Sequence, residues 1–282
     1  MDTAVYIESI ERDGQLLAEA AERAGLDAPV PTCPEWRVRD LLTHLGQVHR
    51  WAARYVAEGL TEPVQPSTVS EPGGAELVEW FREGHRRLIA TLAAAPADLK
   101  CWSFLPAPSP LAFWARRQAH ELAIHRVDAQ AALAAAFPPV QPVPPVQPVQ
   151  PGSPIPAVPP VPPVSTFPPF PADFAADGID EIVVGFHGLK TSKARTSTPR
   201  TLRIRATDTD DIWTMHLSEE APRTIRTGRL PEGATAADCE LSGGASDLYL
   251  VLWNRLPLDE VSVTGDSSLA DLWREKSTIG RK

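Results

Sequence analysis

The sequence has no apolar run that reaches the roughly 18 residues a membrane-spanning helix needs. It has no secretory signal at its start either, because the opening MDTAVYIESIERDG is acidic and contains no long apolar core. Cysteine is scarce: Cys33, Cys101 and Cys239 are odd in number and far apart, which argues against a disulfide framework. These absences predict a cytoplasmic protein with reduced thiols and no membrane partner.

Basic residues are outnumbered by acidic ones. The 282-residue chain has 27 Lys and Arg against 36 Asp and Glu, a formal net charge of −9. An acidic surface repels nucleic acid and anionic lipid, so we expect neither as a partner. The hydrophobic fraction of 43% is ordinary for a globular protein, and the length predicts two domains of roughly 100–200 residues each.

Proline, by contrast, is concentrated in one segment. The stretch from Pro138 to Pro171 holds 16 of the 30 prolines. Proline removes a backbone donor and fixes φ, which favours an extended polyproline II tether over a helix or a sheet. A binding site for an SH3-like partner is the alternative. We therefore divide the chain into a domain at residues 1–137, a Pro-rich linker at 138–171 and a C-terminal domain at 172–282.

Four helices are expected before the linker. Apolar residues recur at helical spacing from Thr3 to Ala24, from Cys33 or Trp36 to Ala57, from Gly74 to Ala94, and from Leu111 to Ala136. Thr32 and Glu35 match a capping box for the second of these helices. Four helices of this length joined by loops favour a four-helix bundle.

Beyond the linker, the spacing of apolar residues changes from helical to the alternation typical of strands. We expect strands at 201–206, 212–217, 239–242 and 261–264, and helices at 245–253 and 267–273. Asp266 is expected to cap the last helix. This pattern predicts a small α+β domain.

The fourth predicted helix carries a candidate pair of metal ligands. His120 and His125 look at first like a zinc-protease pair, but they lie five residues apart, about 140° around the helix. Glu121 and His125 lie at i and i+4 and share one face, so their side chains can converge on one ion. The same spacing is common on solvated helices, and such a surface pair is the alternative.

A third ligand has to come from another helix, and His44 is the candidate. It steps by three and four residues with Leu41, Val48 and Trp51 along one inward stripe, whereas His49 points elsewhere. Together with the pair on the fourth helix it would leave one coordination position open for water or substrate. A hydrogen-bonded core histidine is the alternative reading of His44.

Three further residues have both a functional and a structural interpretation. Asp128 lies one turn after His125 and either orients that ligand or has a surface or capping role. Arg255 ends an apolar helix, and its catalytic interpretation is that it meets a substrate carboxylate across the domain interface. Cys33 lies at the head of a helix, where a thiol pKa can be lowered, but a structural role is favoured.

Five segments resemble the mycothiol-dependent maleylpyruvate isomerase family of actinobacteria. They are TCPEWRVRDLLTHLGQVHRW, RRQAHELAIHRVDA, DGIDEIVVGF, LSGGASDLYLVLWNRLPL and VTGDSSLADLW, in the right order. The resemblance implies a DinB-like metal-binding four-helix bundle followed by the family's α+β domain. It also implies that His44, Glu121 and His125 are the metal ligands and that zinc and mycothiol are the cofactors. The Pro-rich linker departs from the family pattern, where a short connection is expected.

The resemblance also implies a reaction. In such an enzyme a zinc-bound thiolate attacks a small electrophilic substrate. If the thiol leaves after rotation about the attacked bond, the reaction is a cis-trans isomerisation, and if it stays attached, the reaction is an S-transfer. We expect a general mycothiol-dependent transferase or isomerase over maleylpyruvate isomerase itself. The alternative is a non-catalytic metal-binding or regulatory protein with a small-molecule or protein-binding C-terminal domain.

Shortening the Pro-rich linker is expected to leave thermal unfolding and metal content nearly unchanged. A flexible connection tolerates a cut to ~12 residues, because each doubling of its length costs only about 0.6 kcal/mol of closure entropy. Melting curves and metal content of the shortened chain test this. A large drop in melting temperature would show that the segment packs as part of a core.

Overall fold

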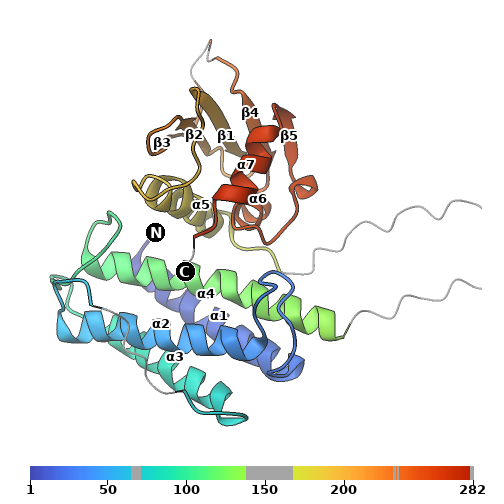
Figure 1. Cartoon of the computed structure of the whole chain (residues 1–282). Coiled ribbons are helices and arrows are strands. Elements are labelled where there is room, and N and C mark those ends of the chain that lie inside the picture. The colour runs from blue at the N-terminus through green and yellow to red at the C-terminus, as the bar shows by residue number, and fades with distance from the viewer. Residues whose placement is uncertain (65–70, 138–167, 231–232, 234, 280–282) are drawn as a thin grey trace, which may run out of the picture.

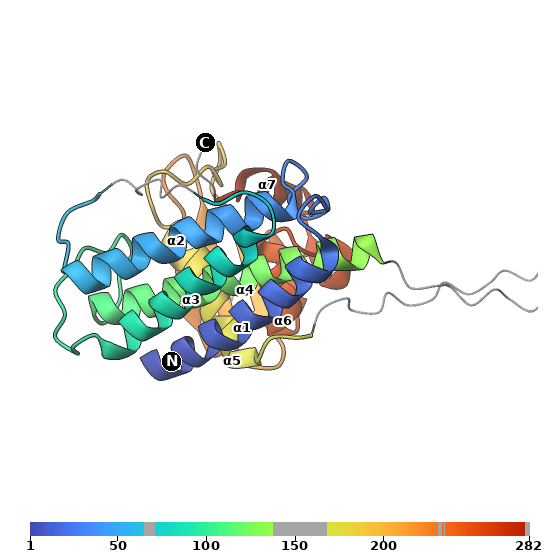
Figure 2. The ribbon, with the colours of Figure 1, turned by 90° about the horizontal axis from the view of Figure 1, so that it is seen from below.

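The computed structural model describes residues 1–64, 71–137, 168–230, 233 and 235–279, and most of the predicted Pro-rich linker, 138–167, lies outside these. Four long helices run side by side (Figures 1 and 2): α1 (Thr3–Ala24), α2 (Val38–Glu58), α3 (Glu76–Ala94) and α4 (Pro110–Ala136). The predicted four-helix bundle is therefore confirmed. No helix in the described part of the chain is long and apolar enough to cross a membrane.

The start of α2 differs from the prediction. The helix begins at Val38, where Arg37 N donates a hydrogen bond to Asp40 Oδ2 at 2.7 Å. The predicted capping box that starts at Thr32 is wrong, because Thr32 Oγ1 donates to Asp128 Oδ1 on α4 at 2.5 Å. The segment before α2 is thus tied to another helix of the bundle instead of starting its own.

The C-terminal part combines short helices with a sheet. α5 (Ala172–Asp180) continues into the π-helical turn η1 (Glu181–Phe186). The sheet has the strand order β3-β2-β1-β4-β5, in which β1 and β4 are parallel and the other neighbours antiparallel. The strands of the sheet are β1 (Arg200–Ala206), β2 (Ile212–Leu217), β3 (Arg223–Thr227), β4 (Cys239–Gly243) and β5 (Ser262–Gly265). The helical elements after β4 are α6 (Ala245–Leu252), the 3-10 turn η2 (Leu258–Glu260) and α7 (Ser268–Lys276). This confirms the α+β prediction.

Strand β3 was not predicted, and its composition explains why. The sequence RTIRT has a single large apolar residue, Ile225, which is 52% exposed. β3 forms one edge of the sheet, where charged side chains protect an open row of backbone groups from pairing with another chain. Asp266 was expected to cap the last helix; α7 has Ser267 in the N-cap position, and Asp266 Oδ1, one residue earlier, accepts from Ser268 N at 3.1 Å.

Helix α4 lies between the rest of the bundle and the C-terminal part (Figure 1). It starts at the N-cap Ser109, whose Oγ accepts from Ala112 N at 3.1 Å. Of its 27 residues, 17 are buried, so it has no continuous solvent face. The buried apolar side chains form one cluster that includes residues of both parts of the molecule. Polar side chains on α4 are therefore enclosed between the bundle and the C-terminal part.

A buried histidine in the C-terminal part should make stability depend on pH. His187 Nε2 donates to Ser277 O at 3.3 Å, its Nδ1 accepts from Ser192 Oγ at 2.9 Å, and burial lowers the pKa of His187 to about 4. The unfolded chain, with an ordinary histidine pKa of about 6.5, takes up the proton first as pH falls, so stability is lost from about pH 6.5 down to about pH 4.

We expect the His187 contribution to the free energy of unfolding to fall by about 2 kcal/mol between about pH 7 and about pH 5. Urea unfolding at the two pH values measures it. The His187→Gln variant has no titrating group at position 187, so its free energy of unfolding should fall less over the same pH range, by about the same 2 kcal/mol. An identical pH dependence in the variant would contradict the assignment.

Candidate metal centre

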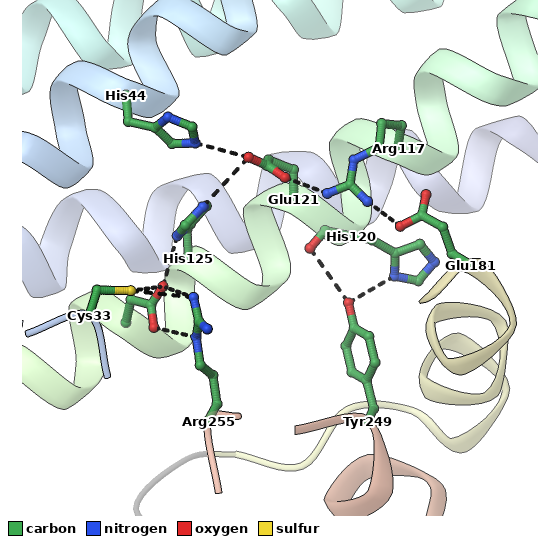
Figure 3. Close-up of polar contacts among 10 residues, drawn as sticks. Cys33, His44, Arg117, His120, Glu121, His125, Glu181, Tyr249 and Arg255 are labelled. Atoms are coloured by element: carbon green, nitrogen blue, oxygen red, sulfur yellow. Dashed lines mark hydrogen bonds and ion pairs between the residues drawn. The ribbon is translucent and has the colours of Figure 1, made fainter. Parts of the chain in front are cut away.

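The three residues predicted as metal ligands meet between α2 and α4. Figure 3 shows the rings of His44 and His125 directed toward the carboxylate of Glu121. His44 Nε2 lies 3.0 Å and His125 Nε2 lies 3.5 Å from Glu121 Oε1. One ligand atom from each residue lies within 4.8 Å of the other two. The cluster joins a residue of α2 to an i, i+4 pair of α4.

The geometry and chemistry of this cluster fit a divalent ion. Ligand bonds of about 2 Å in a tetrahedral arrangement place neighbouring ligand atoms roughly 3–3.5 Å apart, as the two distances to Glu121 Oε1 are. Two imidazole nitrogens and one carboxylate oxygen suit zinc and similar ions. Three protein ligands leave a coordination position for a further molecule.

Asp128 fixes the orientation of the His125 ring. The carboxylate of Asp128 is fully buried and accepts from His125 Nδ1 at 2.8 Å, which leaves Nε2 to face the cluster. The Trp36 ring stacks on the His125 ring, with the ring centroids 5.7 Å apart and an interplanar angle of 19°. Burial alone would lower the pKa of His125, but hydrogen bonds to Asp128 and Glu121 outweigh it and raise that pKa to about 9. Asp128 therefore lies in neither a surface nor a capping position.

The second carboxylate oxygen of Glu121, Oε2, is held by an arginine. Arg117, one turn earlier on α4, donates from Nη2 to Glu121 Oε2 and from Nη1 to Glu181 Oε2 on η1 (Figure 3). Burial would raise the pKa of Glu121, but the charge of Arg117 and the hydrogen bonds with His125 and His44 outweigh it and hold that pKa well below its usual range. The carboxylate is therefore ionised, as a metal ligand must be.

Arg255 reaches the site from the C-terminal part, but its guanidinium is directed at Asp128. Nε and Nη2 of Arg255 donate to the two oxygens of Asp128 at 2.8 and 2.9 Å. Cys33 lies beside this pair, with its Sγ 3.4 Å from Arg255 Nη2. Burial and the charge of Asp128 raise the pKa of the Cys33 thiol to about 12, and α2 begins five residues later. The lowered pKa considered for Cys33 is therefore wrong.

The two histidines that were expected to stay outside the cluster lie elsewhere. His49 is fully buried against Phe81, with its ring centroid 5.4 Å away. His120 points to the other side of α4, where its Nδ1 lies 3.1 Å from Tyr249 Oη and its Nε2 lies 2.8 Å from Asp177 Oδ2. His120 thus joins α4 to α5 and α6 across the interface between the two parts.

A cavity of about 1060 Å³ opens beside the three ligands. Both parts of the chain line it, including Trp51 from α2 and Trp253 after α6. Three residues around the cluster, Trp36, Arg117 and Glu181, were not predicted from the sequence. The i, i+4 spacing of Arg117 and Glu121 was a usable signal, whereas nothing in the sequence links Glu181 to either residue.

Comparisons with known proteins agree with this architecture. The four-helix bundle followed by an α+β part is the arrangement of a DinB-like helical protein with an added C-terminal domain. The family model described as the mycothiol maleylpyruvate isomerase N-terminal domain matches residues 7–130, and the MDMPI C-terminal domain matches residues 170–272. The chain belongs to the mycothiol maleylpyruvate isomerase family. A search of curated proteins gives no match. Membership implies a mycothiol-dependent isomerase or a related enzyme that uses a small-molecule thiol.

Proposed function

We propose that this protein uses a divalent ion, for which zinc suits the two histidine nitrogens and one carboxylate oxygen, to activate the thiol of mycothiol for attack on a small electrophile. The observation that carries this proposal is the convergence of His44, Glu121 and His125 at the wall of a cavity. When bound there, the ion would supply a positive charge that lowers the pKa of the thiol, so that the thiolate is present at neutral pH.

The chain's own residues would orient the metal ligands and surround the substrate. Asp128 accepts a hydrogen bond from His125 Nδ1–H and so directs Nε2 toward the cluster, where metal binding would displace the Nε2 proton. Arg117 holds one oxygen of Glu121 and leaves the other for the ion. Much of the cavity wall is apolar, and a substrate that displaced water from it would strengthen the electrostatic interactions inside. No protein nucleophile is required, which agrees with the raised pKa of Cys33.

The reaction is either a cis-trans isomerisation or an S-transfer. In the first, the thiol sulfur adds to a conjugated double bond, the resulting single bond rotates, and the thiol leaves. In the second, the carbon–sulfur bond persists in the product. A cavity beside the ligands supports an enzyme over the alternative of a non-catalytic metal-binding or regulatory protein, because such a protein has no need of a substrate space next to an open coordination position.

Metal removal tests the proposal. Protein purified without chelator should contain about one divalent ion per chain and consume an electrophile only when mycothiol is present. Chelation should abolish both properties, and added zinc should restore both. Metal binding without any acceleration of the thiol reaction, over a panel of electrophiles, would favour the non-catalytic alternative.

A further inference from the structure

The cavity beside the three predicted metal ligands has a largely apolar wall that is rich in aromatic rings. Its wall contains six large rings from both parts of the chain, namely Trp36, Trp51, Trp102, Phe104, Phe186 and Trp253. Rings of this kind contribute large apolar contact areas to a bound ligand and favour flat, polarizable partners. The shape and surface of the cavity therefore suit an aromatic or otherwise apolar molecule.

Arg117, one of the two arginines in the wall, is already paired with carboxylates of the protein. The guanidinium of Arg117 lies between two carboxylates, Glu121 and Glu181, and donates to both. Its side chain is only 5% exposed, and that of Glu181 is 2% exposed. A substrate carboxylate would have to displace a buried partner, which leaves that partner unpaired at high cost.

The second arginine is neutralised in the same way. Arg255 donates to both oxygens of Asp128, whose side chain has no exposed area, and its Nη1 donates to Trp253 O at 2.8 Å. The pair is a planar, two-point interaction of the kind that arginine forms with carboxylates. The catalytic interpretation of Arg255, contact with a substrate carboxylate, would require this pair to break.

The remaining charges of the described wall leave no net attraction for an anion. Without metal, the His125 ring lies between two carboxylates, 2.8 Å from Asp128 Oδ2 and 3.5 Å from Glu121 Oε1. A bound divalent ion would be balanced by Glu121 and an activated thiolate. Glu35, exposed at the edge of the cavity, adds a negative charge. The other polar groups include three neutral amides, Gln47, Gln118 and Asn254. Gln118 is 1% exposed and its Oε1 has no hydrogen-bond partner among the described residues, so an uncharged polar group can be accommodated there.

We propose that this cavity accepts an uncharged, largely aromatic electrophile and discriminates against carboxylates, including the dicarboxylate maleylpyruvate. The inference names the substrate class of the site and rests on the proposed function. An anionic ligand would lose its hydration without gaining a free cation among the described residues, whereas an uncharged aromatic ligand would bury apolar area and keep its few polar atoms near amides.

Binding of a matched pair of fluorescent probes tests the inference without metal, thiol or turnover. N-phenyl-1-naphthylamine is uncharged, and 8-anilinonaphthalene-1-sulfonate has the same rings with an added anion. We expect the uncharged probe to bind the full chain at least about tenfold more tightly, because a charge-assisted hydrogen bond is missing for the anion. Gln47→Lys places a cation in the wall and should tighten binding of the anionic probe about tenfold or more, while Gln47→Glu should not.

The charged residues outside the described part are Glu232, Arg281 and Lys282. The comparison is therefore repeated on a chain that lacks residues 280–282, and the same preference is expected. Equal or tighter binding of the anionic probe by the unsubstituted chain, or no binding of the uncharged probe, would overturn the inference. The inference would also be overturned if the Gln47→Lys substitution left the affinity for the anionic probe unchanged.

A second arm measures turnover with mycothiol and the zinc-loaded chain. The electrophiles are 1-chloro-2,4-dinitrobenzene and its carboxylate analogue 4-chloro-3,5-dinitrobenzoate. In each reaction a carbon–sulfur bond forms, the carbon–chlorine bond breaks, chloride leaves, and the thiol proton goes to solvent. Relative to the uncatalysed rates, kcat/KM should favour the uncharged compound by at least about tenfold. If neither compound, nor an uncharged cis-enone, is consumed but the probe preference holds, the proposed function fails and the charge selectivity of the cavity stands.

Discussion

Replacing His125 or His44 with alanine is expected to remove the metal ion and the thiol-dependent activity while the fold remains. Each substitution leaves two protein ligands of three, so metal content should fall from about one ion per chain to less than about 0.1. The bundle should persist, because its helices are held by a continuous cluster of buried apolar side chains. Elemental analysis and circular dichroism of the variants measure the two properties.

Two other histidines provide controls for this experiment. His216→Ala changes an exposed residue of β2 and should leave metal content and stability unchanged. His120→Ala removes contacts to Asp177 and Tyr249 at the interface, so it should lower the melting temperature without removing the metal. If His120→Ala removed the metal as completely as His125→Ala, the assignment of ligands to one face of α4 would be wrong.

Replacing Asp128 with alanine is expected to damage both stability and metal affinity. The variant leaves the guanidinium of Arg255 without its carboxylate, and breaking a buried ion pair in this way costs about 3–5 kcal/mol. His125 also loses the acceptor that orients its ring, a change that weakens metal binding roughly 10–100-fold in comparable sites. Urea unfolding measures the first effect, and titration against a competing chelator measures the second.

A double variant separates the two effects. Asp128→Leu together with Arg255→Met removes both charges, so much of the lost stability should return. Metal affinity should stay low, because His125 still lacks its acceptor. Recovery of full metal affinity in the double variant would show that Asp128 does not orient His125, and that its role is confined to pairing with Arg255.

The local part of the site could be predicted from the sequence. Glu121 and His125 are one helical turn apart, and the stripe that contains His44 fixes which way that residue faces, so helical periodicity alone brings these side chains to inward faces. The four helices and most strands follow from the same periodic signals. The start of α2 could not be predicted in this way, because Thr32 donates its hydrogen bond to a residue 96 positions away and not to the helix that follows it.

The long-range part of the site could not be predicted. Glu181 lies 64 residues from Arg117 and Arg255 lies 127 residues from Asp128, yet these pairs fix the residues around Glu121 and His125. Ion pairs of this kind depend on how the C-terminal part packs on α4, which no local pattern encodes. In the structure Arg255 donates to both oxygens of the buried Asp128 carboxylate, while its contact with a substrate carboxylate stays a prediction.

The most direct test of the account is spectroscopic. The chain is loaded with cobalt(II) in place of zinc and titrated with mycothiol, and His125→Ala is treated in the same way. The account predicts a thiolate-to-cobalt charge-transfer band that saturates at about one thiol per ion in the unsubstituted chain and is absent from the variant. A cobalt-loaded chain that shows no such band at saturating mycothiol, or a variant that shows it undiminished, would contradict thiol activation at His44, Glu121 and His125.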